Sequence, residues 1–248
     1  MTRTTTLTLL ALVLAAAPAR GQALGDRIRA AHGARVTFQF AARPGVCGNG
    51  ENLDTHHAEG DLTWDCHPGP LVVTLTRDDA GRVTRLRTSV GAPPPADATD
   101  LGTVTPAEAS AWLLDLAGAD LGKPSEAAVL PAVLARDVES WPRLARLAKD
   151  TRLQTGLRRQ AVFWLGQEAA DAVVGPLDTL LTADPDRDVR RMALFTLSQR
   201  HDERSFQILL RIARGDRDPD LRRQAFFWLG RSEDPRGVAF FEEMLAGR

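Results

Sequence analysis

A ten-residue segment occurs three times in the C-terminal half of the chain, at a fixed step of 32 residues. The copies LRRQAVFWLG, VRRMALFTLS and LRRQAFFWLG begin at Leu157, Val189 and Leu221, and the first and third agree at nine of ten positions. A constant period of this size is typical of repeat proteins, in which each unit packs against its neighbours. The sequence therefore predicts three similar units in a row, over residues 152–183, 184–215 and 216–248.

Each unit is predicted to be a pair of helices. In the first copy, Leu157, Ala161 and Leu165 recur at every fourth position and so lie on one helical face. Phe163 widens this apolar stripe beyond what one partner helix could cover. A second apolar stripe begins at Val174 and predicts the second helix. Such helices need burial on several sides, which stacked neighbours provide.

The residues around the repeated segments predict where the helices begin and end. Asp188 and Asp220 precede the first apolar residue of their copies and are expected to cap the helices. Gly166 and Gly230 are expected to end the first helices in a left-handed conformation. Loops between the units are expected to hold two prolines, Pro185 and Pro219.

The core pattern (L/V)-R-R-x-A-x-F-x-L-G resembles HEAT repeats, in particular the short bacterial HEAT-like repeats of the PBS-lyase class. The resemblance covers about residues 125–248, with a degenerate repeat before the three clear units, and it implies a right-handed α-solenoid that serves as a binding scaffold. Two features depart from the family pattern. Gly156 stands where the other copies have an acidic residue, and 32 residues is shorter than the common HEAT period.

Residues 24–91 predict a small α+β module. Val36, Phe38 and Phe40 alternate with polar residues, which indicates a half-buried strand. Two β-rich runs flank a turn-forming segment and predict a hairpin, at residues 71–76 and 82–88. A short helix is expected before the first strand, at residues 26–31.

Three consecutive prolines, at positions 93–95, predict an extended linker over residues 92–104. Beyond it, residues 105–248 read as helical. Thr105 and Glu108 form a capping box at the start of the first helix. Later helices are expected to begin with Ser125 and Ser140. The predicted fold class is mostly α: a C-terminal α-solenoid of HEAT-like helix pairs, preceded by a small disulfide-tied α+β module.

The two cysteines, Cys47 and Cys66, both lie in the predicted α+β module. In an exported protein a disulfide between them is the favoured interpretation. The alternative is a metal site, because His56, His57 and His67 lie between or beside the cysteines. That alternative is weaker, since the cysteines are isolated and the set lacks the close ligand spacing of zinc sites.

Residues 1–23 resemble a secretory signal peptide. Arg3 gives a positive start, and residues 7–17 form an apolar stretch that is too short to span a bilayer. Small residues offer cleavage sites after Ala19 or, preferably, after Ala23. We therefore expect an exported protein, periplasmic or extracellular, that does not span the membrane; a buried N-terminal helix is the alternative.

The charged residues of the repeats allow two interpretations. Each copy carries an arginine pair, which could line a groove for nucleic acid or another acidic ligand, or could pair with the acids between units. The formal net charge of −1 favours the pairing interpretation and argues against a nucleic-acid partner.

The acidic triplets that begin at Asp184 and Asp216 resemble an EF-hand opening but lack its Gly and Glu positions. Trp164 and Trp228 are expected to pack between units, with a carbohydrate- or peptide-binding row as the alternative.

No hydrolase or metalloprotease motif occurs in the sequence, so we expect neither catalysis nor a metal or cofactor. The favoured function is a non-catalytic protein-interaction scaffold in the cell envelope, with an unidentified protein partner. The alternatives are an accessory or lyase-type enzyme related to HEAT-like lyases, and a glycan- or peptide-binding envelope protein. Positions that differ between units on the second helices are the candidate contact surface: Thr179, Arg211, Glu243 and Gln207.

Overall fold

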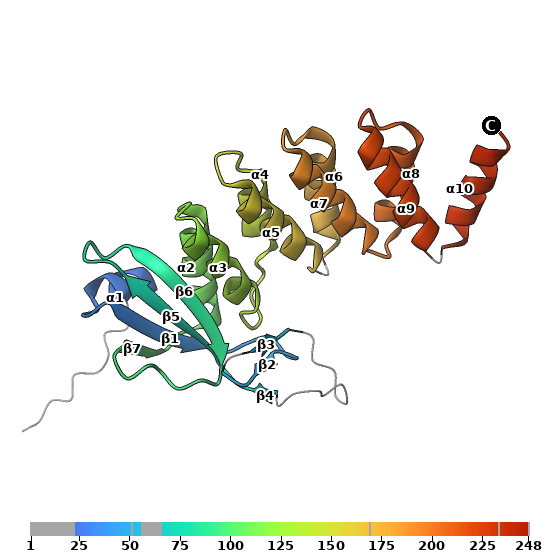
Figure 1. Ribbon diagram of the computed structural model, residues 1–248. Helices are drawn as coiled ribbons and strands as arrows, with labels where there is room; N and C mark the ends of the chain where they lie inside the picture. Colours follow the sequence, from blue (N-terminus) through green and yellow to red (C-terminus); the bar gives the residue numbers. More distant parts are fainter. Residues whose placement is uncertain (1–22, 51, 56–65, 169, 233, 248) are drawn as a thin grey trace, which may run out of the picture.

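The computed structural model describes residues 23–50, 52–55, 66–168, 170–232 and 234–247. A sheet-containing part lies at one end of the molecule, and the helices extend from it in a row to the C-terminus (Figure 1). One hydrophobic core runs through both parts, from Leu24 to Phe240. Within these described residues, no helix is both long enough and apolar enough to cross a bilayer.

The main sheet has four strands in the order β6-β5-β1-β7. Strand β1 (Arg35–Phe40) pairs antiparallel with β5 (Leu71–Arg77), which pairs antiparallel with β6 (Val83–Val90). The β5–β6 hairpin confirms the one expected from the two β-rich runs. Phe38 and Phe40 are fully buried, as the alternation predicted.

Strand β7 (Thr99–Thr103) shows that the predicted linker over residues 92–104 is wrong in its second half. It pairs parallel with β1 at the edge of the sheet. Beyond the strand, the Val104 amide donates to the Gln39 carbonyl at 2.9 Å. The sequence TDLGT has little β-propensity and no alternation, so local patterns could not reveal this strand. Pairing with β1 decides its conformation.

The cysteines lie beside a second, small sheet in the order β3-β2-β4. Its strands are β2 (Cys47–Gly48), β3 (Leu53–Asp54) and β4 (His67–Pro68). A disulfide joins Cys47 to Cys66, with the Cα atoms 5.3 Å apart, and this confirms the favoured interpretation of the cysteines. His67 pairs with Gly48 in the sheet, whereas His56 and His57 lie outside the described residues.

Helix α1 (Leu24–Ala30) is tied to the hairpin by a buried arginine. The Arg77 guanidinium donates to the carbonyl oxygens of Ile28 at 2.6 Å and of Ala31 and Gly33 at 2.8 Å. The last carbonyls of a helix have no partner within it, so this side chain satisfies groups that burial would otherwise leave unpaired.

Helices α2 (Pro106–Gly118) and α3 (Lys123–Val133) join the sheet to the row. Trp112 of α2 meets Phe38 edge-to-face at 5.9 Å, and α3 contacts β6. Thr105 caps α2 as predicted, because its hydroxyl accepts from the Glu108 amide at 3.2 Å.

The prediction that Ser125 caps α3 is wrong. The N-cap is Gly122, with a φ of 70° that favours glycine. Ser125 lies in the first turn, where its hydroxyl donates to the Leu116 carbonyl at 2.7 Å and accepts from the Leu121 amide at 2.9 Å. It therefore fastens α3 to the end of α2.

The remaining helices form pairs that follow one another in a row (Figure 1). Each first helix packs on the second helix before it: α5 on α4, α7 on α6 and α9 on α8. The helix pairs thus match the predicted units, preceded by α4 from the degenerate repeat. The bounds are α4 (Trp141–Lys149), α5 (Thr155–Gly166), the 3-10 turn η1 (Asp171–Val173), α6 (Val174–Ala183), α7 (Arg187–Ser198), α8 (Glu203–Gly215), α9 (Pro219–Arg231) and α10 (Pro235–Leu245).

The predicted capping residues of the first helices are displaced by two positions. The N-caps are Asp186 and Asp218, and the residues expected in that role, Asp188 and Asp220, lie in the first turn. The Asp186 carboxylate accepts from the Asp188 amide at 2.8 Å, and Asp218 does the same for Asp220 at 2.9 Å. Pro219, expected in a loop, is the first residue of α9, where its missing N–H costs nothing.

The glycines expected in left-handed conformations at the helix ends are not in that conformation. Gly166 and Gly230 lie within α5 and α9, and the residues that end these helices, Gln167 and Ser232, have φ values of −76° and −69°. Gly166 instead allows the Thr196 side chain of the next unit to pack closely against α5. A Cβ there would overlap Cγ2 of Thr196 in the next unit, well inside van der Waals contact.

Candidate interaction surfaces

The first arginine of each repeated pair is part of the framework. Arg158 and Asp184 form an ion pair with each side chain only 3% exposed, and Arg158 Nε also donates to the Ala148 carbonyl at 3.0 Å. Breaking such a pair costs about 3–5 kcal/mol, because one charge stays buried without its partner. Arg190 likewise bonds the Asp184 carbonyl at 3.0 Å and the Asp218 carboxylate at 3.2 Å. These contacts bear out the interpretation of a salt-bridge ladder between units.

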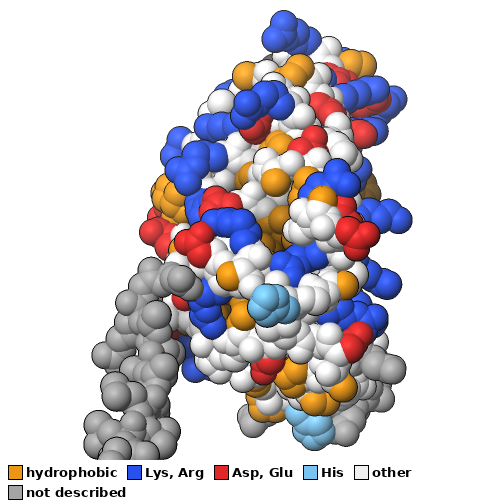
Figure 2. Space-filling model, turned by 90° about the vertical axis from the view of Figure 1, so that its left-hand side faces the viewer, with side chains coloured by type: hydrophobic (Ala, Val, Ile, Leu, Met, Phe, Trp, Pro, Cys, Tyr) orange, Lys and Arg blue, Asp and Glu red, His pale blue; other side chains and the backbone are white. Residues whose placement is uncertain are grey.

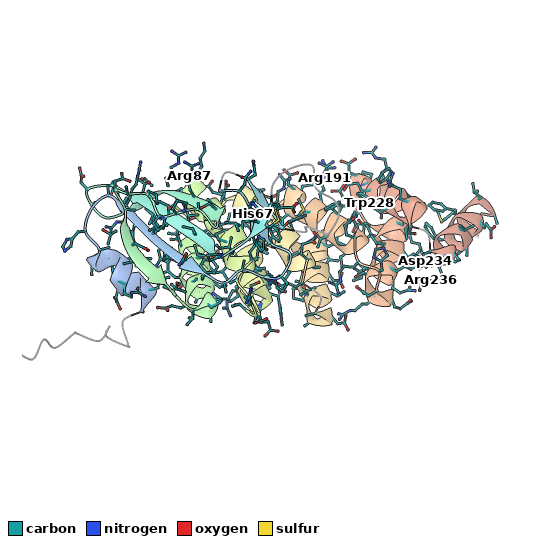
Figure 3. All side chains as sticks on the ribbon, turned by 90° about the horizontal axis from the view of Figure 1, so that it is seen from below. His67, Arg87, Arg191, Trp228, Asp234 and Arg236 are labelled. Atoms are coloured by element: carbon teal, nitrogen blue, oxygen red, sulfur yellow. A yellow bond between two sulfur atoms is a disulfide. The ribbon has the colours of Figure 1, made fainter. Side chains whose placement is uncertain are left out.

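The second arginine of each pair is exposed, at positions 159, 191 and 223. Arg191 points outward from the row (Figure 3) and lies 3.8 Å from Asp188, while Arg223 forms an ion pair with Asp220. Acids in the same helical turn therefore compensate the charges of Arg191 and Arg223, whereas the first turn of α5, which holds Arg159, has no acid. Seen from the sheet end, basic and acidic side chains are interspersed over the surface (Figure 2).

The acidic triplets between units serve as caps and ion-pair partners. A hydrogen bond from the Thr155 hydroxyl, together with amide hydrogen bonds, holds the pKa of Asp186 below its usual range. Burial raises the pKa of Asp218, but hydrogen bonds from Arg187 and Arg190 outweigh it and the net shift is downward. In the part of the chain that the structure describes, no group of three or more His, Cys, Asp or Glu residues could hold a metal ion.

The four residues of the candidate contact surface all lie exposed on second helices. Thr179 is on α6, Gln207 and Arg211 are on α8, and Glu243 is on α10. Two ion pairs link these helices: Arg211 with Asp178, and Arg214 with Glu243 at 2.9 Å. We call the surface formed by Thr179, Gln207, Arg211 and Glu243 the second-helix face. The structure thus brings the four residues onto adjacent helices.

A hollow of about 640 Å³ opens on the second-helix face. Gln207 and Arg211 line it, whereas Thr179 and Glu243 do not. Its remaining lining includes Arg214 and Arg217 beside Asp216, so its rim is mainly basic.

A second hollow, which the sequence did not indicate, lies between the turns of the second and third units. We call this cavity of about 680 Å³ the turn groove; residues 198–202, Phe206, Leu209, Trp228, 231–232 and 234–236 line it. An adjoining hollow of about 370 Å³ shares residues 199–202 with it and continues to residues 166–168 of the first unit. Together they follow the helix-to-helix turns of three consecutive units.

Ion pairs hold the walls of the turn groove. The Arg236 guanidinium lies 4.2 Å from the centre of the Phe206 ring and pairs with Asp234 and Glu203 (Figure 3). Hydrogen bonds from the Arg236 side chain and backbone lower the pKa of Asp234 to about 2. Arg200 bonds Asp202 at 2.8 Å and the Glu168 carbonyl at 2.9 Å, which connects adjacent turns.

Two nitrogen-bearing side chains of the turn groove remain available. His201 and Arg231 are exposed, and within the described ranges neither forms an ion pair with a carboxylate. Arg231 instead lies 5.7 Å from the centre of the Phe227 ring. Trp228 completes the wall (Figure 3) while it packs on Phe195 at 5.4 Å. The groove can therefore receive a segment with acidic and apolar groups.

The tryptophans pack mainly between side chains of the row. Trp164 is half-buried against Phe163, with ring centres 5.2 Å apart. Trp228 is half-buried against Phe195 and Phe227, and it additionally lines the turn groove. The packing interpretation of these residues therefore has direct support.

Sequence reasoning missed the turn groove because its residues come from loops of different units. One signal was present: Asp202 and Asp234 occupy the same repeat position, and so do Arg204 and Arg236. The same spacing of an acid and an arginine recurs at two consecutive turns, which indicates that the two turns have the same structure. No other unit has a histidine at the position of His201.

Residues 142–230 match a family model described as HEAT repeats. This segment extends from α4 through most of α9, which are the helices that form the row of pairs. This part of the chain is therefore a member of the HEAT-repeat family, as the repeated pattern indicated. The match leaves out the sheet-containing part and α10. No curated protein matches the chain.

Proposed function

We propose that this protein is a non-catalytic protein-interaction scaffold, built as a short α-solenoid and exported to the cell envelope. One observation carries the proposal. Most of the repeated apolar residues are buried between the helices, whereas the exposed positions on the second helices differ from unit to unit. A framework that repeats and a surface that varies are the properties of a scaffold that binds a partner of non-repeating sequence.

The partner segment is expected to carry acidic and apolar side chains. The hollow on the second-helix face has Arg211, Arg214 and Arg217 at its rim. The turn groove adds His201 and Arg231 beside an indole ring. Charge complementarity of this kind steers association and sets specificity.

Export is supported by two features. The N-terminal segment has the composition of a signal peptide, and the Cys47–Cys66 disulfide suits an oxidising compartment. The mass of the protein recovered from the periplasm would test this. A mature chain that begins at Leu24, or at Arg20 for the alternative cleavage site, is expected, whereas an intact chain starting at Met1 in the cytoplasm would contradict export.

The scaffold proposal is tested by affinity capture from an envelope fraction, followed by mass spectrometry. The variants are R211A with Q207A on the second-helix face, and R231A in the turn groove. The control is R87A, which removes an exposed arginine from β6 at the far end of the molecule (Figure 3). Loss of one exposed ion pair costs at most about 1 kcal/mol, so Arg211 can be removed without unfolding the chain.

A protein captured by the wild type and R87A is expected to be depleted at least tenfold with one of the two surface variants. Equal recovery with all the variants would overturn the assignment of both surfaces. The lyase-type alternative rests on the resemblance alone. The glycan-binding alternative needs exposed tryptophans, whereas Trp164 and Trp228 are half-buried.

A further inference from the structure

The turn groove is larger than the equivalent space between the first two units. Its volume is about 680 Å³, against about 370 Å³ for the hollow that adjoins it. Both spaces lie between successive turns of one row, so a difference at equivalent positions is expected to explain the change. Residues 200 and 232 form such a pair, because they are one repeat step of 32 residues apart.

Arg200 occupies the space between the first two turns, whereas Ser232 leaves the next space open. The Arg200 side chain is only 11% exposed, and it donates to the Glu168 carbonyl of the preceding turn at 2.9 Å and to Asp202 of its own turn at 2.8 Å. The Ser232 hydroxyl donates instead to the Leu229 carbonyl of its own helix, at 2.7 Å. This short side chain does not extend to the second unit, so the turn groove stays open.

The open groove has an apolar floor and planar groups in its walls. Phe206 and Leu209 line the floor and are only 6% and 4% exposed. Trp228 and Arg236 line the walls (Figure 3), and the Arg236 guanidinium lies 4.2 Å from the centre of the Phe206 ring. An aromatic ring packs favourably against an indole and on a guanidinium. These surfaces therefore favour an aromatic side chain as the occupant.

The charges of the groove favour acidic neighbours for that aromatic side chain. Its carboxylates already have partners, because Asp202 pairs with Arg200 and Asp234 pairs with Arg236. Arg231 is exposed and, within the described ranges, forms no ion pair. Its guanidinium can therefore receive a carboxylate of the occupant.

His201 lies where the turn groove meets the adjoining hollow, because it lines both. A segment that is anchored in the groove and continues toward the first unit passes this imidazole. Histidine side chains gain positive charge as the pH falls from about 8 to about 5.5, whereas Arg, Asp and Glu side chains ordinarily keep their charge. An acidic segment is therefore expected to bind more tightly at the lower pH. The other charged residues that line the two spaces are Glu168, Arg200, Asp202, Arg231, Asp234 and Arg236.

We propose that the turn groove is the anchor site for the partner, and that it takes one aromatic side chain flanked by carboxylates from an extended peptide segment. The inference rests on the proposed scaffold function and narrows the partner to one class of peptide. Trp228 and Arg236 hold the ring, while Arg231 and protonated His201 receive the carboxylates. A volume of about 680 Å³ suits a short segment of this kind, since ligand pockets measure about 300–1,000 Å³.

Fluorescence anisotropy of a fluorescein-labelled EEFEE peptide, titrated with residues 24–248, tests the anchor. A Kd of order 10–100 µM is expected for the wild type. The EEAEE peptide is expected to bind at least tenfold more weakly, because it lacks the ring that the groove buries. Equal binding of EEAEE, or no binding of EEFEE up to about 1 mM, would overturn the proposal.

The variant S232R tests the groove itself, because it places an arginine at the position where Arg200 fills the preceding space. Added positive charge alone would strengthen binding of EEFEE, whereas a filled groove is expected to weaken it at least tenfold. R231E is expected to weaken binding about tenfold, because attraction becomes repulsion. R87A is the matched control on β6, and it is expected to bind like the wild type. Unchanged or stronger binding by S232R, or an equal loss with R87A, would overturn the assignment of the groove.

The role of His201 is tested by the pH dependence of the same titration. The affinity of the wild type for EEFEE is expected to rise about threefold between about pH 8 and about pH 5.5, because one exposed charge pair is gained. H201N, which cannot be protonated in this range, is expected to show a flat profile, as is the wild type with QQFQQ. A rise that H201N retains would overturn the role of His201.

The anchor and the scaffold proposal fail in different ways. Thermal unfolding by circular dichroism first verifies that each variant is folded. An envelope protein whose capture depends on Arg211 but not on Arg231 would sustain the scaffold and overturn the anchor in the turn groove. Binding of EEFEE that S232R abolishes would sustain the anchor even where no envelope protein is captured.

Discussion

Gly166 and Gly230 occupy the same repeat position but meet different neighbours. A Cβ on Gly166 would overlap the Thr196 side chain of the next unit, whereas a Cβ on Gly230 would lie 3.6 Å from the Phe241 ring, an ordinary contact. The Thr196 hydroxyl is buried and, among the described residues, has no hydrogen-bond partner. The small residue at 166 therefore sets how closely the first two units approach.

We predict that G166A destabilises the protein by about 1–3 kcal/mol, because a filled core has no room for an added methyl group. G230A is the control and is expected to be neutral or to stabilise by up to about 1 kcal/mol, since alanine favours the helix. Urea unfolding measures both changes. The double variant G166A with T196A should recover most of the loss; equal effects of the two glycine substitutions would contradict the packing explanation.

At the scale of the elements, aspartate caps begin four consecutive helices of the repeat region. The caps are Asp186, Asp202, Asp218 and Asp234, and each carboxylate accepts a hydrogen bond from an amide of the first turn. The pKa of every one of them is lowered. A lowered pKa means that the folded state favours the charged carboxylate, so the ionised caps stabilise the helix pairs.

This predicts acid sensitivity with a defined sign. Hydrogen bonds from Arg236 lower the pKa of Asp234 to about 2, against about 3.9 in an unfolded chain. Its contribution is therefore present above about pH 4 and is lost as the pH falls toward about 2. Circular dichroism melts across this range should show a falling melting temperature.

D234N is expected to flatten part of that decline, because asparagine still caps the helix but cannot be protonated in this range. The control is D79N in the exposed turn between β5 and β6. An equal pH dependence in D234N and the wild type would show that this cap does not contribute to acid unfolding.

At the scale of the whole molecule, the sheet and the row of helices are one structure. Backbone hydrogen bonds join them: the Arg43 amide donates to the Leu134 carbonyl at 2.8 Å, and the Arg136 amide donates to the Ala41 carbonyl at 3.0 Å. Arg43 also pairs with Glu168 at 3.0 Å, which reaches into the first repeat unit. The proline segment therefore does not divide the chain into independent parts.

We predict that residues 24–91 alone do not fold, because this fragment lacks β7 and the helices that cover the sheet. Residues 24–150 add β7 and α2 to α4 and are expected to fold cooperatively. Far-ultraviolet circular dichroism during heating distinguishes the two fragments. A cooperative transition in residues 24–91 would show that the hairpin, β1 and the disulfide suffice.

Features whose signal is local or periodic could be predicted from the sequence. The 32-residue step gave the helix pairs, the β-rich runs gave the hairpin, and comparison of the units identified exposed residues such as Arg211 and Gln207. The turn groove could not be predicted in this way, because Trp228, Arg231 and His201 come together only when two turns are stacked.

The sequence by itself determined the repeat units, the apolar faces of their helices and the pair of cysteines. The period of the apolar residues and the positions of the cysteines can be read directly from the order of the residues. Only the tertiary structure decided that residues 99–103 form a strand and that Gly166 permits close packing. Each of these depends on a neighbour distant in sequence, and local propensity carries no information about that neighbour.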